Sequence, residues 1–255
     1  MLDLFGFYII LILLLSIVSS MQLNGIVLSN NSTRYNHTKN TLINSGFIVS
    51  QKVFLDPQSD IIKQELDLLG LSYSDIKLPK EKLKMYLSNK LSFLEAIESF
   101  VHEPNSISNS TDWKFFFEDD ISMHPSLLNN NTNNTAFLIN QALHIDSIRR
   151  EGLVYLGICI PHCEPTLGNI DNINISKCYG FCAHAFGIAK WKSRHFLRTI
   201  SSMGALCYVF DVCLIKYGMK VKNIPLIGSN LISPQHNNHY GIFYQDRNIF
   251  ESIVK

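Results

Sequence analysis

An aromatic run that ends in three acids, Trp113-Lys-Phe-Phe-Phe-Glu-Asp-Asp-Ile121, constrains this chain more than any other stretch. A short apolar run rich in aromatic residues is typical of a buried β-strand. Three consecutive acids cannot all be buried without a cation or a set of hydrogen-bond donors. The pattern therefore predicts that the strand carries Glu118, Asp119 and Asp120 to the rim of a sheet. In open α/β sheets that rim, beyond the carboxyl ends of the strands, is where ligands bind.

The spacing of these acids suits a divalent metal. Glu118 and Asp120 are separated by one residue, so in extended geometry their side chains leave the same face. Mg2+ and Mn2+ are commonly held by one or two carboxylates together with substrate phosphates. The acids therefore predict a metal site that also holds a diphosphate. The alternative is a solvated acidic turn at the start of a helix, which would not need the aromatic strand in front of it.

The N-terminal part of the chain has the pattern of a βαβ unit. Residues 23–28 are predicted to form a strand, residues 34–45 a helix that Gly46 ends, and residues 47–54 a second strand. Strand, helix and strand within about 30 residues form a βαβ unit, and its right-handed crossover makes the strands parallel. Arg34 would then lie at the ligand-binding rim, where it could meet a phosphate or a base. A solvated Arg34 is the alternative.

The alternation of helix and strand signals continues to a loop-rich tail. Further helices are predicted after Ser59, over 78–90, from a capping box at Ser92 to Glu95, over 135–150 and over 190–203, and further strands over 153–159, 179–188 and 220–226. The polar stretch 122–134 is expected to be a loop, either a lid or disordered. We expect an α/β fold with one domain over residues 22–255, a mostly parallel central sheet and a cysteine-rich insertion around 159–182.

Composition limits the class of partner. The chain has 255 residues, of which 46% are hydrophobic and 11% aromatic, which suits one large domain with a substantial core. Its formal net charge is +1, and no basic stripe runs along the sequence. A nucleic-acid-binding surface needs clustered positive charge, so we expect no nucleic-acid partner.

The first 21 residues are predicted to be a signal anchor or a signal peptide. The apolar run from Leu4 to Val18 is about 15 residues long, whereas a bilayer span needs about 20. Asp3 and the lack of Lys or Arg before the run are atypical of a signal peptide. Both alternatives send the chain into the secretory lumen, as a single-pass type II membrane protein of the Golgi or ER or as a secreted protein. Sequons agree with this, at Asn30, Asn31, Asn36, Asn109, Asn130, Asn133 and Asn174.

All six cysteines lie between positions 159 and 213. In an oxidising compartment an even number of cysteines favours disulfides, and six cysteines allow 15 pairings. The candidates are Cys159, Cys163, Cys178, Cys182, Cys207 and Cys213. On one helix Cys207 and Cys213 would point roughly 120° apart, so we expect each to pair elsewhere. The alternative is a zinc site built from the Cys-x3-Cys pairs at 159/163 and 178/182 with His162 and His184.

One acid and three histidines stand out in the C-terminal half. Asp211 lies in an otherwise apolar segment, residues 208–215, where it either caps the next helix or faces the site. A buried Asp needs partners or a raised pKa, and the second case suits a general base. His184 lies among small residues that leave room for a ligand, and a core histidine is the alternative. The tail offers His236 and His239.

Four stretches of the chain, taken in order, resemble glycosyltransferase family 25, which includes lipooligosaccharide and procollagen galactosyltransferases. They are Gly25-Ile-Val-Leu28 with the helix after it, Phe116-Phe-Glu-Asp-Asp-Ile121, Gly180 to Ile188 around Cys-Ala-His-Ala-Phe-Gly-Ile, and Phe210-Asp-Val-Cys-Leu214. The resemblance runs over most of residues 23–232, and the acidic stretch is its sharpest part. The cysteine insertion and the histidine-rich tail do not match the family.

The resemblance implies a GT-A fold, Rossmann-like and single-domain, that uses a nucleotide sugar, expected to be UDP-linked, and Mn2+ or Mg2+. It implies that Asp120 binds the metal directly and that Glu118 and Asp119 help hold the metal or the ribose. An inverting reaction needs a carboxylate that deprotonates the acceptor hydroxyl, and Asp211 is the candidate. Candidate contacts to the donor or acceptor are Arg34, His184, His236 and His239.

The expected function is therefore transfer of a sugar, such as galactose, to a hydroxyl of a glycan or glycoprotein in the secretory pathway. One alternative is a metal-dependent phosphodiesterase or nuclease, which would need more converging carboxylates and histidines. Another is a non-catalytic, disulfide-stapled carbohydrate-binding protein, and a third is a transferase fold that has lost its activity.

Overall fold

The computed structural model describes residues 23–68, 78–104, 112–128, 134–204, 207–221, 223–247 and 249. The segment predicted to be a signal anchor or signal peptide, residues 1–21, lies outside the described residues, so that prediction stays a prediction. In the part of the chain that is described, no helix is both long enough and apolar enough to cross a bilayer.

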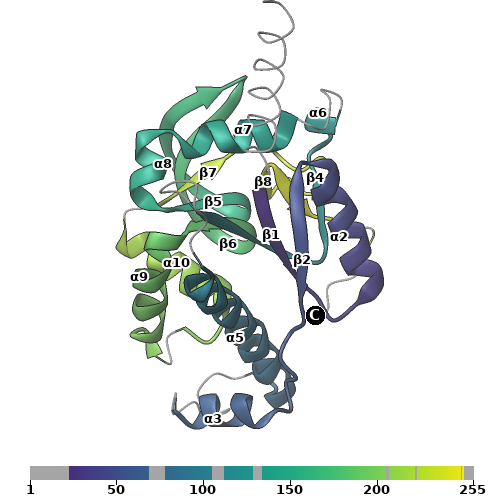
Figure 1. The fold of residues 1–255 in the computed structure, drawn as a ribbon, viewed down its shortest axis with the longest axis vertical. Helices are drawn as coiled ribbons and strands as arrows, with labels where there is room; N and C mark the ends of the chain where they lie inside the picture. The colour runs from purple at the N-terminus through teal and green to yellow at the C-terminus, as the bar shows by residue number, and fades with distance from the viewer. Residues whose placement is uncertain are drawn as a thin grey trace, which may run out of the picture.

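A central sheet with helices on both faces forms the body of the protein, so the prediction of an α/β fold is confirmed (Figure 1). The helices are α2 (Ser32–Asn44), α3 (Asp60–Leu68), α5 (Lys80–His102), α6 (Pro125–Leu128), α7 (Asn134–Leu143), α8 (Asp146–Glu151), α9 (Lys190–Ser201) and α10 (Phe210–Lys220). The strands are β1 (Leu23–Leu28), β2 (Phe47–Lys52), β3 (Trp113–Glu118), β4 (Ile121–Met123), β5 (Leu153–Ile170), β6 (Ile173–Ala189), β7 (Ile224–Ile227), β8 (His239–Gly241) and β9 (Phe243–Gln245).

The seven-stranded sheet is parallel over its first three strands and mostly antiparallel over the rest. The order is β2-β1-β3-β6-β7-β5-β8, and β1 runs parallel to both β2 and β3. β6 pairs antiparallel with β3, β5 and β7. The prediction of a mostly parallel sheet therefore holds for β2, β1 and β3 and for the short parallel pairing of β5 with β7, and is wrong for the other pairings. The reason is that β5 and β6 are joined directly as a hairpin, which makes neighbouring strands antiparallel.

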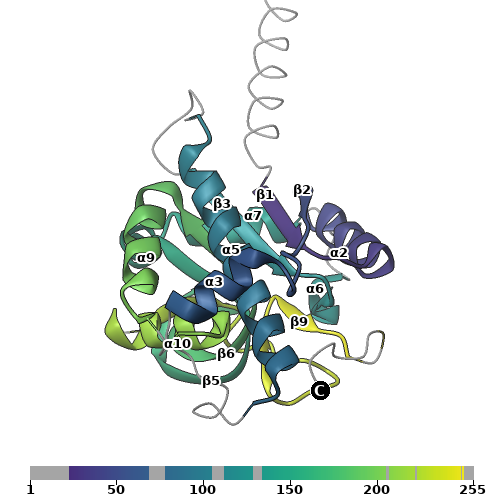
Figure 2. The same ribbon diagram turned by 90° about the horizontal axis from the view of Figure 1, so that it is seen from below.

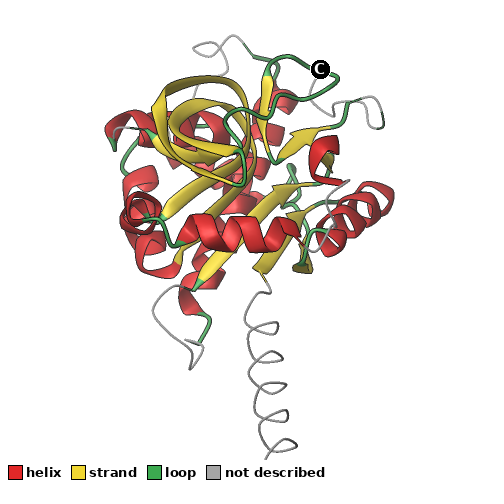
Figure 3. Ribbon diagram, turned by 90° about the horizontal axis from the view of Figure 1, so that it is seen from above, coloured by secondary structure: helices red, strands yellow, loops and turns green. Residues whose placement is uncertain are grey.

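The expected cysteine-rich insertion is the outer part of this hairpin. β5 and β6 stay paired as far as Ile170 and Ile173, with several register shifts along the way. Figure 3 shows the hairpin curling away from the flat part of the sheet. β7 lies against the curl, pairing with β6 from Ile175 to Cys178. The stretch is therefore an extension of the main sheet and not a separate unit.

The aromatic strand β3 links two hydrophobic layers. Because side chains alternate along a strand, Phe115 and Phe117 enter one buried cluster and Phe116 enters the other. The first cluster includes residues of α2, α7 and α8, and the second includes residues of α5, α9 and α10. Figure 2 shows α5, α9 and α10 together on one side of the sheet. Burial of each Phe contributes roughly 1.5–3 kcal/mol, which explains why this strand fixes the centre of the sheet.

The βαβ prediction is confirmed at the N-terminus. α2 begins two residues earlier than expected because Asn31 caps it, its side chain accepting hydrogen bonds from the backbone N–H of Thr33 and Arg34. Gly46 follows the helix with a left-handed φ of 91°, as predicted for the residue that ends it.

Three local predictions are wrong. Residues 80–102 form one continuous helix, and Ser92 lies in its middle, where its hydroxyl donates to the carbonyl of Ser88 and accepts from the N–H of Leu55. The helix expected over 135–150 is split into α7 and α8 at residues 144–145. Part of the loop expected at 122–134 is ordered structure, because β4 pairs antiparallel with β9 and α6 follows it.

Candidate functional site

The acidic triplet lies where the sequence predicts, at the carboxyl end of β3. Glu118 is the last residue of the strand, while Asp119 and Asp120 form the turn that leads to β4. The expectation that Glu118 and Asp120 leave one face of an extended strand is therefore wrong. The two carboxyl groups are still close enough that Asp120 raises the pKa of Glu118. Asp119 and Asp120 are both buried, so the alternative of a solvated acidic turn is wrong as well.

Arg34 neutralises part of this acidic charge. One of its terminal nitrogens, Nη2, lies 2.7 Å from Oδ1 of Asp119 and 3.0 Å from Oδ2 of Asp120. The hydroxyl of Ser29 donates a further hydrogen bond of 2.5 Å to Oδ2 of Asp119. Arg34 is buried, so the alternative of a solvated Arg34 is wrong. Burial nevertheless outweighs these partners and raises the pKa of both Asp119 and Asp120.

Glu118 has the most perturbed carboxyl group of the three. Burial raises its pKa well above the ordinary value, and the nearby charges of Asp120 and Asp211 raise it further. The side-chain amide of Gln245 donates a 2.5 Å hydrogen bond to Oε2 of Glu118. A raised pKa means that a carboxyl group holds its proton over a wider pH range, and this applies to all three acids and most strongly to Glu118.

Asp211 comes from the C-terminal half of the chain and lines the cleft beside the three acids. It lies in the first turn of α10, whose N-cap is Val209, so the predicted capping role is wrong. A negative charge in the first turn is favoured by the helix dipole. Asp211 lines the same cleft as the triplet, and its charge raises the pKa of Glu118. The prediction that Asp211 faces the candidate site is therefore confirmed, and its role there stays a prediction.

These groups all line one cleft of about 500 Å³. It opens at the carboxyl ends of β1, β2 and β3 and is bounded by α5 and the N-terminus of α10. Its polar and charged lining residues are Asn30, Asn31, Arg34, Ser88, Asn89, Glu118, Asp119, Asp120, Asp211, Gln245 and Arg247. Phe54, Tyr86 and Met85 provide apolar and aromatic walls. We call this the acidic cleft.

Several residues of the acidic cleft were not found by sequence reasoning, and two of them lie close to the acids in the tail. Gln245 and Arg247 come from the tail, which was expected to be loops. The tail instead forms β9, and the backbone N–H of Asp246 donates to the carbonyl of Asp120. The run Tyr240-Gly-Ile-Phe-Tyr244 could have predicted this strand, because its aromatic and β-branched residues favour a strand.

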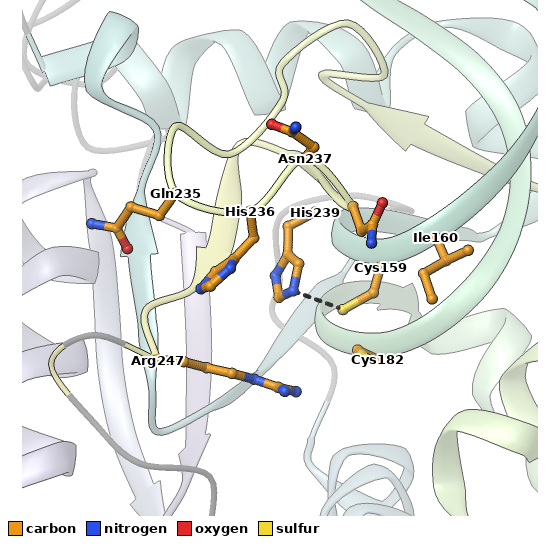
Figure 4. Close-up of a pocket in the computed structure, with 9 residues that line it drawn as sticks. Cys159, Ile160, Cys182, Gln235, His236, Asn237, His239 and Arg247 are labelled. Carbon is orange, nitrogen blue, oxygen red and sulfur yellow. Dashed lines mark hydrogen bonds between the residues drawn. The ribbon is translucent and has the colours of Figure 1, made fainter.

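The three candidate histidines lie elsewhere, at a second cleft of about 460 Å³. His236 and His239 line it together with Cys159, Cys182 and Arg247, as Figure 4 shows. His184 is buried behind it, with ring centroids of His184 and His239 5.7 Å apart. None of the three lines the acidic cleft, so the structure does not bring them together with the acids. Cys182 and Arg247 line both clefts and separate them.

Four of the six cysteines are joined in pairs, Cys163 to Cys178 and Cys207 to Cys213. The expectation that Cys207 and Cys213 pair elsewhere is wrong, because α10 begins only at Phe210 and the two residues do not share a helix. The first pair also contradicts the proposed zinc site of two Cys-x3-Cys pairs. Cys159 and Cys182 are not joined to another cysteine.

Comparison with known proteins adds nothing to this geometry, since no protein-family model matches the chain and no curated protein matches it. The resemblance to glycosyltransferase family 25 therefore remains a hypothesis drawn from the four sequence stretches and from the site they share.

Proposed function

We propose that the protein is a metal-dependent glycosyltransferase with a GT-A-like fold, which moves a sugar from a nucleotide donor to a hydroxyl of a glycan or glycoprotein. One observation carries the proposal. Arg34, the Glu118–Asp120 triplet and Asp211 come from distant parts of the chain, and all of them line one cleft at the carboxyl ends of parallel strands. Ligands bind at this place in open α/β sheets.

The acids fit a hard divalent ion such as Mn2+ or Mg2+. These ions prefer carboxylate oxygens and use one or two of them together with substrate phosphates. Oδ1 of Asp120 is buried and has no hydrogen-bond partner among the described residues, whereas Oδ2 contacts Arg34. An unpartnered buried carboxylate oxygen is a suitable metal ligand. When bound, the ion would offset negative charge on the leaving diphosphate.

The remaining lining residues suit a nucleotide and an acceptor. Tyr86 and Phe54 offer aromatic surface for a base, and Arg247 offers a positive charge for phosphate oxygens. Asp211 would accept the proton of the acceptor hydroxyl as a general base. Glu118, which accepts a hydrogen bond from Gln245, would help hold the metal or the ribose.

The proposal is tested by thermal shift with nucleoside diphosphates and nucleotide sugars, with and without Mn2+. A ligand at 100 times its Kd stabilises the native state by about 2.7 kcal/mol, so a specific nucleotide is readily detected. We expect stabilisation by one nucleotide class only when Mn2+ is present, and its loss in Asp120→Asn. The matched control is Asp60→Asn, which changes an exposed acid of α3 outside the cleft. No shift with any nucleotide would overturn the proposal.

One observation favours a second candidate, a lumenal binding protein with a transferase-like fold and no activity. Arg34 already contacts both Asp119 and Asp120, so a positive charge is present without a metal. Measuring nucleotide release from the donor separates the two candidates. Binding of the nucleotide sugar with no release of nucleotide, in the presence of varied glycan acceptors, supports the inactive protein.

A further inference from the structure

Three buried side chains from distant parts of the chain meet behind the second cleft. Cys159 lies on β5, His184 on β6 and His239 on β8, and their exposed fractions are 2%, 0% and 7%. Among the described residues, this is the one group of three or more His, Cys, Asp or Glu side chains whose possible ligand atoms all lie within 4.8 Å of one another. Sγ of Cys159 is 3.5 Å from Nε2 of His239, the contact drawn in Figure 4.

The hydrogen bonds of His184 leave one ring nitrogen in an unfavourable position. Nδ1 is 2.6 Å from the carbonyl oxygen of Cys182, and Nε2 is 2.9 Å from the carbonyl oxygen of Phe243. A neutral imidazole carries only one N–H, so it can donate to only one of these two acceptors. His184 is fully buried, and burial disfavours the doubly protonated, charged ring. A cation close to the second nitrogen would relieve the contact between two lone pairs.

In the described part of the chain, one ring nitrogen of His239 also lacks a hydrogen-bond donor or acceptor beside it. Its Nδ1 is buried and has no hydrogen-bond partner among the described residues. Its pKa is lowered to about 3, by burial first and then by His184, His236 and Arg247. A neutral imidazole carries a lone pair on one of its two nitrogens. Nε2 lies 3.5 Å from Sγ of Cys159, so it is the nitrogen of this ring placed to share an ion with the thiol.

We propose that Cys159, His184 and His239 form a soft-metal site that binds one Zn2+ ion through a thiolate sulfur and two imidazole nitrogens. This donor set differs from the oxygen ligands of the acidic cleft, because thiolate and imidazole select Zn2+ over Mg2+ and Mn2+. A proton on Nδ1 of His184, donated to the Cys182 carbonyl, leaves Nε2 for the metal. Zinc-bound histidines commonly use a backbone carbonyl in this way to fix the ring.

Binding changes the protonation of only one ligand. Contact with the Cys182 thiol and burial both raise the pKa of the Cys159 thiol, so the metal-free site holds a neutral S–H. When the Zn–S bond forms, this proton leaves to solvent, and the two imidazoles bind as neutral ligands. Three protein ligands leave a fourth position of a tetrahedral ion open. That position would face the cleft lined by His236 and Arg247 or be taken by the nearby Cys182.

The competing chemistry at these residues is a third disulfide. Cys159 and Cys182 lie close together on the paired strands β5 and β6, and neither is joined to another cysteine. An S–S bond between them would remove the thiolate that the metal needs. The two states therefore exclude each other and can be told apart in one preparation.

The test uses the full-length chain, purified without chelator from a secretory host. Bound metal is measured by mass spectrometry and Zn2+ affinity by competition with a chromophoric chelator. Co2+ is then used as a probe, since thiolate ligation gives a sulfur-to-cobalt charge-transfer band. We expect one Zn2+ per chain, and an affinity lowered at least 10-fold to 100-fold in Cys159→Ser and His239→Gln, with loss of the charge-transfer band in Cys159→Ser.

Two controls isolate the site. His162→Gln changes an exposed histidine of the same hairpin and should leave Zn2+ affinity unchanged. Asp120→Asn should also leave it unchanged, so failure of the proposed transferase function and failure of this site are distinguishable. The proposal is overturned if folded wild-type protein binds no Zn2+ or Co2+, if Cys159→Ser retains the charge-transfer band, or if peptide mapping finds a Cys159–Cys182 disulfide.

Discussion

Gln245 donates a hydrogen bond from its side-chain nitrogen to Oε2 of Glu118 at 2.5 Å. Its side-chain oxygen accepts a hydrogen bond from Arg247 at 3.1 Å and lies 3.9 Å from Sγ of Cys159. One amide therefore connects the acidic cleft to the cysteine and histidine cluster. Its orientation is fixed, because only the nitrogen can donate to a carboxylate and only the oxygen can accept from an arginine.

The first prediction concerns this amide. Gln245→Leu keeps a similar volume but leaves the half-buried Glu118 without its donor, so we expect the free energy of unfolding to fall by about 1–3 kcal/mol. Urea unfolding monitored by circular dichroism measures the change. Gln141→Leu, at an exposed position on α7, is the control and should change stability by less than about 0.5 kcal/mol. Equal effects of the two variants would contradict a bridging role for Gln245.

The second prediction concerns the ion pairs of Arg34. Arg34→Met removes the cation beside two buried carboxylates, and breaking such a buried pair lowers stability by about 3–5 kcal/mol. Adding Asp119→Asn and Asp120→Asn to Arg34→Met removes the uncompensated charges and should recover part of the loss. Denaturant unfolding of the single and triple variants measures both effects.

The control for Arg34 is an ion pair that is exposed to solvent. Arg149→Met breaks the contact with Asp146 on α8, and surface pairs of this kind contribute about 0–1 kcal/mol. A cost for Arg34→Met no larger than that for Arg149→Met would mean that Arg34 does not stabilise the acidic turn.

The third prediction separates catalysis from donor binding. Under the proposed function, Asp211→Asn removes the base that accepts the acceptor proton but keeps the size of the side chain. General-base catalysis contributes about 10²–10⁴ in rate, so kcat should fall by that factor. The thermal shift caused by the nucleotide with Mn2+ should change little, because the metal ligands are unaltered. Loss of nucleotide binding together with activity would place Asp211 in the donor site instead.

The position of the acidic triplet could be predicted from sequence because it depends on local patterns. The run Trp113–Phe117 specifies a strand, and the acids that follow must lie at its end. The βαβ unit could be predicted for the same reason, since Asn31 and Gly46 mark the two ends of its helix. In each case the physical cause lies within a few residues of the element it determines.

The partners of the acids could not be predicted in this way. Gln245 and Glu118 are 127 positions apart, and their contact depends on how β9 docks against β4. Periodicity shows that a segment is a strand but not which strand it pairs with, so the antiparallel half of the sheet was missed. The pairing of Cys207 with Cys213 was missed because it depends on α10 beginning after Cys207, and helix ends are poorly defined by sequence.

The fourth prediction concerns the two disulfides, which close loops of different length. Cys163 and Cys178 are 15 residues apart, and Cys207 and Cys213 are 6 apart. In the chain-entropy description a longer closed loop restricts the unfolded state more, so the first bond should stabilise by about 3 kcal/mol and the second by about 2 kcal/mol. The variant pairs Cys163→Ser with Cys178→Ser, and Cys207→Ser with Cys213→Ser, test this by urea unfolding without reductant.

The test depends on which of the two disulfides costs more unfolding free energy when it is removed. Both cysteines of the second pair are buried in the cluster that includes residues of α5, α9 and α10, whereas Cys163 of the first pair is exposed and only Cys178 is buried there. Polar serines therefore add a larger desolvation cost at the second pair. Alanine replacements at all four positions remove that difference and should restore the order set by loop length. If the alanine pair at 207 and 213 still costs more than the pair at 163 and 178, loop entropy does not govern these bonds. The short bond would then stabilise the native state by holding the start of α10 against the sheet.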